Sequence, residues 1–252
     1  MHVYTYMKQA EQYVARISSD KNIKIISVCN EYLLCRSRLG SKRETKIPLH
    51  LTPELAYFVG VMLGDGYIVS DRFRIGIEKG NKQYLEEIFL PLISNLFGFE
   101  TKVVKAKSWW RVFIRNKALW IYLTTVFNLP IGKRRQISVP EVFCDTSAEL
   151  KAPFIAGILD TDGGKRGKGF GFTTAHPNFN DSIVEMLKQL DVEVIRDSWF
   201  NKKYSKQYYG WKITKKSELL KLSKTIPLKN HKRIKVLSNL CGDTQAVKGV
   251  GF

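Results

Sequence analysis

The sequence predicts an α+β protein made of two similar halves that are related by a pseudo-two-fold axis. The segment 58–66, FVGVMLGDG, recurs as 155–163, IAGILDTDG, so that Asp162 lies 97 positions after Asp65. A second landmark, an apolar-Pro-apolar triplet followed by basic residues, recurs at the same offset of 97, where Pro130 is matched by Pro227. Solenoid repeats have about 20 to 50 residues, so a repeat of this length indicates two compact halves.

The elements follow the same order in both halves. Residues 1–50 precede the repeat and predict an amphipathic helix over 4–17 and strands over 23–28 and 32–36. The first half, 51–146, predicts helices over 53–63, 81–96 and 117–127, an extended segment over 73–79, and a basic, aromatic strand segment after residue 100. The second half, 147–252, predicts an extended segment over 170–174, a helix over 180–190, a second basic strand segment and a helix over 217–225.

The repeated segments predict two helices with well-marked boundaries. Thr52 is the expected N-cap of the first helix, and Pro53 at the first helical position loses no needed hydrogen bond. Gly66 is expected to end this helix in the left-handed conformation. In the second copy, Pro153 predicts either a kink or a later helix start.

Small residues recur at the same positions of both helices. Gly60 and Gly64 are four residues apart on one face, where each costs about 1 kcal/mol relative to alanine. Gly157 and Thr161 hold the matching positions in the second copy. Because glycine removes the side chain that keeps two helix axes apart, the two helices are predicted to pack closely along these faces.

An acid stands at the end of each predicted helix. Asp65 and Asp162 lie where the helix dipole and the free carbonyl groups are negative, so a carboxylate there is disfavoured without a cation. If the helices pair in parallel, both carboxylates converge with the carbonyl groups of Gly64 and Thr161, and these oxygen ligands suit Mg²⁺. The alternative is that each Asp only caps a turn before glycine, and the duplication of the whole pattern favours the metal site.

At this point the residues resemble a known family. The segment 155–163 is very similar to the LAGLIDADG signature, and 58–66 is a looser copy with Leu63 in place of an acid that is not a metal ligand. Two copies in register, over residues 51–238, look like the single-chain LAGLIDADG homing endonucleases. The resemblance implies two αββαββα halves, saddle-shaped antiparallel sheets that enter the DNA major groove, and a two-helix interface. It also implies two or three Mg²⁺ ions held by Asp65 and Asp162, for which Mn²⁺ or Ca²⁺ can substitute in binding.

The resemblance also implies basic residues near the metal ions. Lys79 stands at the end of the first hairpin, where the family has such a residue, whereas Thr174 occupies the matching place in the second half. Lys165, three residues after Asp162, is the candidate for the second basic group, and Lys212 is a weaker one. Each lysine could instead be an ordinary solvated side chain.

Composition and charge favour a nucleic-acid partner. Lys and Arg number 41 against 23 Asp and Glu, a net charge of +18, which suits a polyanion; an anionic membrane surface is the second choice. The apolar run 55–64 is too short to span a bilayer, and the N-terminus lacks a secretory signal, so a cytoplasmic protein is expected. No C-x-x-C pair is present, so the cysteines (Cys29, Cys35, Cys144 and Cys241) are predicted to be reduced and mostly buried, without zinc.

Two strand-rich segments carry the candidate DNA contacts. Residues 101–117 hold six Lys or Arg and no acid, and residues 196–235 hold thirteen against two acids, with aromatic residues interleaved. Because strand residues alternate between faces, a basic face can lie over an aromatic layer. The basic loops 133–135 and 229–233 are predicted to clamp phosphates at opposite ends of the site. The candidate contacts are Arg72, Arg74, Lys105, Lys107, Arg111, Lys133, Arg134, Arg135, Lys202, Lys203, Lys206, Lys212, Lys232 and Arg233.

The predicted function is site-specific cleavage of double-stranded DNA by a monomer, with short 3′ overhangs implied by the resemblance. A first alternative is an intron-splicing maturase or a DNA-binding protein that kept the scaffold without cleavage. A second alternative is the endonuclease domain of an intein. The start at Met1 and the end at Phe252, which lack the residues of a splicing element, favour a freestanding or intron-encoded protein. Residues 1–50 add either a sheet edge or a further DNA contact.

Overall fold

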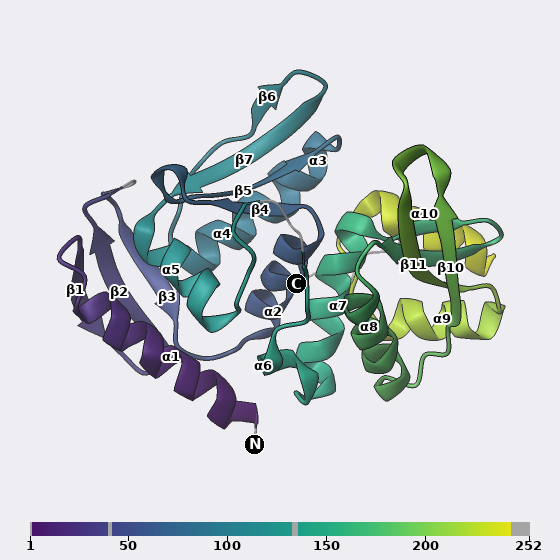
Figure 1. The fold of residues 1–252 in the computed structure, drawn as a ribbon, viewed down its shortest axis with the longest axis horizontal. Coiled ribbons are helices and arrows are strands. Elements are labelled where there is room, and N and C mark those ends of the chain that lie inside the picture. The colour runs from purple at the N-terminus through teal and green to yellow at the C-terminus, as the bar shows by residue number, and fades with distance from the viewer. Residues whose placement is uncertain (1, 40–41, 133–135, 243–252) are drawn as a thin grey trace.

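The computed structural model describes residues 2–39, 42–132 and 136–242. Two helices, α2 (Pro53–Gly64) and α7 (Ala148–Asp162), lie side by side at the centre, and a four-stranded antiparallel sheet lies on each side of the pair (Figure 1). The arrangement confirms the predicted α+β fold with two pseudo-symmetric halves that meet at the repeated helices.

The two halves have the same topology. The first half is α2, β4 (Gly66–Val69), β5 (Arg74–Lys79), a helical segment, β6 (Val104–Ala106), β7 (Trp109–Arg115) and α5 (Lys117–Val126). The second half is α7, β8 (Gly164–Arg166), β9 (Gly169–Thr174), α8 (Pro177–Gln189), β10 (Ile195–Asn201), β11 (Lys206–Ile213) and α9 (Lys216–Thr225). The strand orders β4-β5-β7-β6 and β8-β9-β11-β10 match one another, so both halves have the αββαββα order.

Shorter elements complete the two halves. The helical segment of the first half is α3 (Lys82–Tyr84), a π-helical turn η2 (Leu85–Phe89) and α4 (Leu90–Phe97). Pro91 in the first turn of α4 lacks an N–H group, and the wider π turn before it accommodates that loss. The remaining elements are η1 (Asp71–Phe73), α6 (Glu141–Cys144), η3 (Lys202–Tyr204) and α10 (His231–Cys241).

The N-terminal extension packs on the first half. It contains α1 (His2–Ser18) and a sheet of β1 (Ile23–Val28), β2 (Tyr32–Ser37) and β3 (Glu44–Pro48). The strand β3 was not predicted, because its alternation of buried and exposed residues covers only Thr45 and Ile47 before a proline. The helix α1 lies on α5 (Figure 1), and the buried Tyr6 hydroxyl lies 2.7 Å from the Tyr122 hydroxyl and donates to the Pro48 carbonyl group. Buried hydrogen bonds therefore join the extension to the first half.

The boundaries of the central helices differ in part from the prediction. The Thr52 hydroxyl accepts the N–H of Leu55 at 3.2 Å, which confirms the N-cap. Gly66 is not left-handed: α2 ends at Gly64, Asp65 is its C-cap with φ −106°, and Gly66 begins β4. A Cβ on Gly66 would lie 2.5 Å from the Cα of Met62, so a close approach explains the glycine. Of the two outcomes predicted for Pro153, a kink or a later helix start, the later start is wrong, because α7 begins at Ala148 and continues through Pro153.

The close packing of α2 and α7 places backbone against backbone. A Cβ on Gly60 would lie 2.1 Å from the carbonyl oxygen of Phe154, and a Cβ on Gly157 would lie 2.2 Å from that of Tyr57. Further along, Gly64 faces Thr161. Because both residue numbers increase together along the contact, the two helices run parallel and end on the same side of the molecule.

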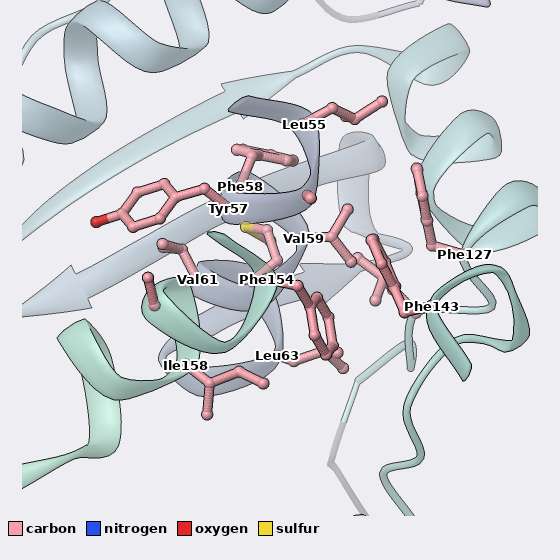
Figure 2. Close-up of a cluster of buried hydrophobic side chains, with 14 of the residues drawn as sticks. Leu55, Tyr57, Phe58, Val59, Val61, Leu63, Phe127, Phe143, Phe154 and Ile158 are labelled. Carbon is pink, nitrogen blue, oxygen red and sulfur yellow. The ribbon is translucent and has the colours of Figure 1, made fainter. Parts of the chain in front are cut away.

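Apolar side chains surround this helix pair. Phe143 of α6 stacks on Phe154 of α7 with ring centroids 4.2 Å apart, and Phe127 stacks on Phe143 at 6.1 Å. Figure 2 shows these rings beside Val59 of α2, whereas the Tyr57 hydroxyl points away from the cluster. Both helices are therefore buried over most of their length, 55–64 in α2 and 154–161 in α7.

The structure also bears on the predicted burial of the cysteines and on the prediction that no segment spans a membrane. Cys35 and Cys241 are buried, but Cys29 and Cys144 are exposed, so the prediction of mostly buried cysteines holds for half of them. All four are free thiols. Within the described ranges, no helix combines the length and the apolar character that a bilayer crossing requires.

Candidate active site at the ends of the paired helices

The two predicted acids stand at the C-terminal ends of the parallel helices. Asp65 caps α2, and its N–H donates to the Val61 carbonyl group at 3.2 Å. Asp162 is the last residue of α7 and is exposed. Since the helices end side by side, the negative ends of two helix dipoles and two carboxylates share one region. This arrangement requires positive charge nearby.

Lys79 supplies one positive charge from the end of β5. Its Nζ forms an ion pair with the Asp65 carboxylate and donates to the Thr161 carbonyl oxygen at 2.8 Å. The Lys79 side chain is 10% exposed, against 30% for Asp65. One ammonium group from the first half therefore joins the acid that caps α2 to the end of α7, and it does so in a partly desolvated place where charges are less screened.

Arg233 supplies a second positive charge, through a contact that the sequence did not indicate. The sequence placed it in a phosphate clamp at one end of the DNA surface, but its Nη2 donates to the same Thr161 carbonyl oxygen at 2.9 Å. Its guanidinium also lies over the start of β8, where a Cβ on Gly164 would be 3.0 Å from Nη1. The clamp itself stays a prediction, but loop order alone does not show that α10 returns to the end of α7.

A buried acid that the sequence analysis missed lies behind this site. Asp160 is 0% exposed, and its Oδ2 accepts the Tyr57 hydroxyl and the Lys229 N–H, both at 2.7 Å. The Tyr57 hydroxyl also lies 3.0 Å from the Tyr84 hydroxyl. Burial raises the pKa of Asp160 to about 6, although the Tyr57 and backbone hydrogen bonds oppose the rise. An acid within an apolar helix repeat was the sequence signal that could have identified it.

The oxygen atoms at the helix ends fit a hard divalent cation. The candidate ligands are the carboxylates of Asp65 and Asp162 and the carbonyl groups of Gly64 and Thr161. The described part of the chain holds no cluster of three or more His, Cys, Asp or Glu that could bind a metal, so an ion here depends on two carboxylates. Mg²⁺ commonly binds through one or two carboxylates together with water and substrate phosphates. The two carboxylates are therefore consistent with Mg²⁺, whereas the Thr161 carbonyl oxygen would have to exchange a hydrogen bond from Lys79 or Arg233 for the ion.

The other two candidate lysines lie apart from these contacts. Lys165 is an exposed residue of β8, paired in register with Phe170, and its side chain has no hydrogen bond or ion pair among the described residues. Lys212 of β11 stands 4.0 Å from the Asp197 carboxylate on the open face of the second sheet. The structure thus brings Lys79, but neither of these side chains, into contact with the helix ends.

The first sheet presents a charged face. Arg74 forms an ion pair with Asp71 at 2.8 Å, and Arg111 lies 3.7 Å from Glu78 on the neighbouring strand. Lys105 pairs in register with Trp110 and stands over its ring at 5.8 Å, so alternation places it on the opposite face from Arg111. The predicted basic face therefore includes Arg74 and Arg111 but not Lys105.

The second sheet carries an ordered cluster that the sequence did not indicate. The guanidinium of Arg166 lies 4.5 Å from the Trp199 ring centroid and donates to the Phe172 carbonyl group at 2.8 Å. Trp199 stacks on Tyr208, and Asp197 lies 3.4 Å from Arg166. These side chains share the face that carries Lys212, so an aromatic and basic surface covers this sheet.

The other candidate DNA contacts lie mainly in hairpin turns. Arg72 and Lys107 adopt positive φ angles of 50° and 51° in the two turns of the first sheet and are exposed. Exposed residues at the β10–β11 hairpin and at the start of α10 are Lys202, Lys203, Lys206 and Lys232. The predicted contacts Lys133, Arg134 and Arg135 lie outside the described residues.

Two parallel helices in backbone contact, each ending in an acid, and two matching αββαββα halves define the LAGLIDADG homing-endonuclease fold. Comparison with solved structures supports this assignment. A mesophilic variant of the homing endonuclease I-DmoI matches with a TM-score of 0.56 and 18% identity over 71% of this chain and 94% of that one. I-DmoI in complex with DNA and Ca matches with a TM-score of 0.55 and 17% identity over 70% and 90%. At this identity the likeness establishes the fold.

Curated relatives match a segment rather than a whole protein. A translation initiation factor IF-2 of Methanocaldococcus jannaschii is 31% identical over 173 residues, which are 65% of this chain and 14% of that protein. A glutamine–fructose-6-phosphate aminotransferase of the same organism is 26% identical over 183 residues, 65% of this chain and 16% of that protein. No family model matches the chain.

Proposed function

We propose that this protein is a site-specific endonuclease that hydrolyses both strands of a double-stranded DNA target with divalent metal ions. The observation that carries the proposal is the convergence of Asp65 and the end of α7 on one partly buried ammonium group, that of Lys79. A non-cleaving scaffold has no use for two carboxylates at the negative ends of paired helices, since they destabilise the folded chain there.

The DNA would lie across the open faces of the two sheets. Both faces carry Arg and Lys beside aromatic rings, and further basic residues stand in the hairpin turns. Phosphate contacts of this kind fix register and orientation, and side chains that reach the major groove choose the sequence. Because one chain holds both halves, a single copy can address both strands.

The residues at the helix ends would divide the chemistry between them. Asp65 and Asp162, with the carbonyl groups of Gly64 and Thr161, would hold Mg²⁺, which supplies an activated water and offsets charge on the scissile phosphates. Lys79 would donate to phosphoryl oxygens and stabilise their developing charge. Lys165 remains a second candidate for that task. Products with short 3′ overhangs are part of the proposal.

A cleavage selection from a randomised DNA library tests the proposal. With the selected target and Mg²⁺, the wild type should convert supercoiled plasmid to linear DNA, and Asp65→Asn and Asp162→Asn should cut at least about 100-fold more slowly. Glu185→Gln, an exposed acid on α8, is the matched control and should cut at the wild-type rate. Full-rate cutting of both strands by either Asn variant would refute the assignment, and binding without cutting by the wild type would favour the non-cleaving alternative.

The curated relatives favour a particular setting for this nuclease. A segment shared by a translation factor and an aminotransferase confers neither activity, because the two activities have nothing in common. The shared segment is better explained as a module carried within unrelated host proteins, the second alternative raised by the sequence. An antibody against this chain, applied to extracts of the native cells, would detect a larger precursor in that case and only a 29.0 kDa product otherwise.

A further inference from the structure

One backbone oxygen at the candidate site accepts hydrogen bonds from two cationic side chains. Thr161 O lies 2.8 Å from Lys79 Nζ and 2.9 Å from Arg233 Nη2. Lys79 comes from the first half, whereas Arg233 comes from α10, which follows α9 at the end of the second αββαββα pattern. The end of α7 is thus compensated from both sides, by one residue of each half.

The start of α10 is anchored directly to α7. The Asn230 amide group donates to the Asp160 carbonyl oxygen at 2.8 Å, and its side-chain oxygen accepts the Lys232 N–H at 3.1 Å as the N-cap of α10. The Lys229 N–H donates to Asp160 Oδ2 at 2.7 Å. Asn230 and Asp160 are 3% and 0% exposed, so water does not compete for these bonds. They fix the helix turn that carries Arg233.

We infer that Arg233 is the basic site residue of the second half, the counterpart of Lys79, and that Asp160 and Asn230 position it. The inference rests on the proposed nuclease function. Without metal, Arg233 neutralises the negative end of α7, and with DNA bound its remaining N–H groups donate to phosphate oxygens. A guanidinium suits this task because it keeps its charge and presents five donors in a fixed plane. Lys165, exposed on β8, is not needed for this role.

Two measurements on the full chain test the inference. The first is cleavage of the selected DNA target in Mg²⁺ at saturating enzyme, where Arg233→Ala should reduce the rate about 100-fold, and Asn230→Ala about tenfold. The second is thermal unfolding in EDTA and in calcium chloride. Arg233→Ala removes one of the two cationic donors to the Thr161 carbonyl oxygen, so calcium should raise its melting temperature more than that of the wild type. Arg233→Lys keeps the charge and should restore the wild-type response to calcium.

Lys235→Ala is the matched control, since Lys235 lies two residues further along α10 and is exposed. It should equal the wild type in both measurements. Equal cleavage by Arg233→Ala and Lys235→Ala would overturn the inference, as would loss of DNA binding alone, which would mark Arg233 as a phosphate clamp. If the wild type cuts no DNA, the proposed function fails. The rise in melting temperature with calcium then still tests whether Arg233 compensates the negative end of α7, and an equal rise in all variants would show that it does not.

Discussion

The sharpest test of the helix interface is Gly60→Ala. The added Cβ would lie 2.1 Å from the Phe154 carbonyl oxygen and 3.2 Å from the Gly157 Cα, and both atoms belong to the backbone of α7. Ordinary contact begins at 3.4 Å, so the two helices must separate by more than 1 Å. No side chain can rotate away to relieve the clash, because the facing atoms are main chain.

The expected loss of stability follows from this geometry. Overpacking of a core commonly costs about 1 to 3 kcal/mol, and a clash with backbone lies at the upper end. Alanine recovers up to about 1 kcal/mol through its helix propensity. A net loss of about 2 kcal/mol corresponds to a fall in melting temperature of about 4 to 8 °C for a chain of this size. The separation also moves Asp65 relative to Thr161, so DNA cleavage should fall more than DNA binding.

Urea unfolding and thermal melting of the wild type and Gly60→Ala measure this loss. Gly80→Ala is the matched control, because a Cβ at Gly80 meets no atom within 4 Å. It should change stability by less than about 0.5 kcal/mol. If Gly60→Ala is as stable as the Gly80 variant, the helices do not touch through their backbones, and the reasoning about the glycine pair is wrong.

Three further predictions concern charged side chains. Burial raises the pKa of Asp160 to about 6, so just below this pH the folded protein holds a proton that the unfolded chain has lost. In urea unfolding, lowering the pH from about 7 to about 5 should therefore raise the stability of the wild type by about 1 kcal/mol relative to Asp160→Asn. Parallel curves of stability against pH would contradict this. Lys79→Met should slow DNA cleavage by about 100-fold, while DNA binding measured by gel shift in calcium stays close to that of the wild type. Undiminished cleavage would show that Lys79 has no role in the reaction. Arg166→Ala should lower stability by about 1 to 2 kcal/mol, because it loses the Trp199 contact and the hydrogen bond to Phe172. The control Arg196→Ala removes an exposed ion-pair partner and should change stability by less than about 1 kcal/mol. Equal losses in the two variants would show that the Arg166 contacts do not stabilise the fold.

Repetition explains why the central elements could be predicted. Asp65 and Asp162 recur at one offset, with small residues one and five positions before each acid. Close helix packing requires small residues, so it can be recognised in the sequence. The N-cap at Thr52 and the strands β5 and β9 could also be predicted, because they depend on residues that are close together in the sequence. The strand β3 left a weaker trace, since its five residues include only two buried alternating positions before Pro48.

The contacts that the sequence did not indicate involve partners that are distant in the chain. Arg233 lies in a basic loop like that at 133–135, and nothing local shows that it meets Thr161, 72 residues earlier. Gly66 follows an acid at a helix end, as a left-handed cap does, but its contact with Met62 depends on how β4 leaves the helix. Arg166 resembles any surface arginine until β10 places Trp199 beside it.

The sequence by itself determined that the chain has two like halves, that two glycine-bearing helices end in acids, and that the surface is strongly basic, because repeats, periodicity and charge are written along the chain. Only the tertiary structure decided which cations meet those acids. Long side chains such as Lys79 and Arg233 reach several ångströms from their backbone, so their partners depend on the packing of β5 and α10 against the helix ends and not on spacing in the sequence.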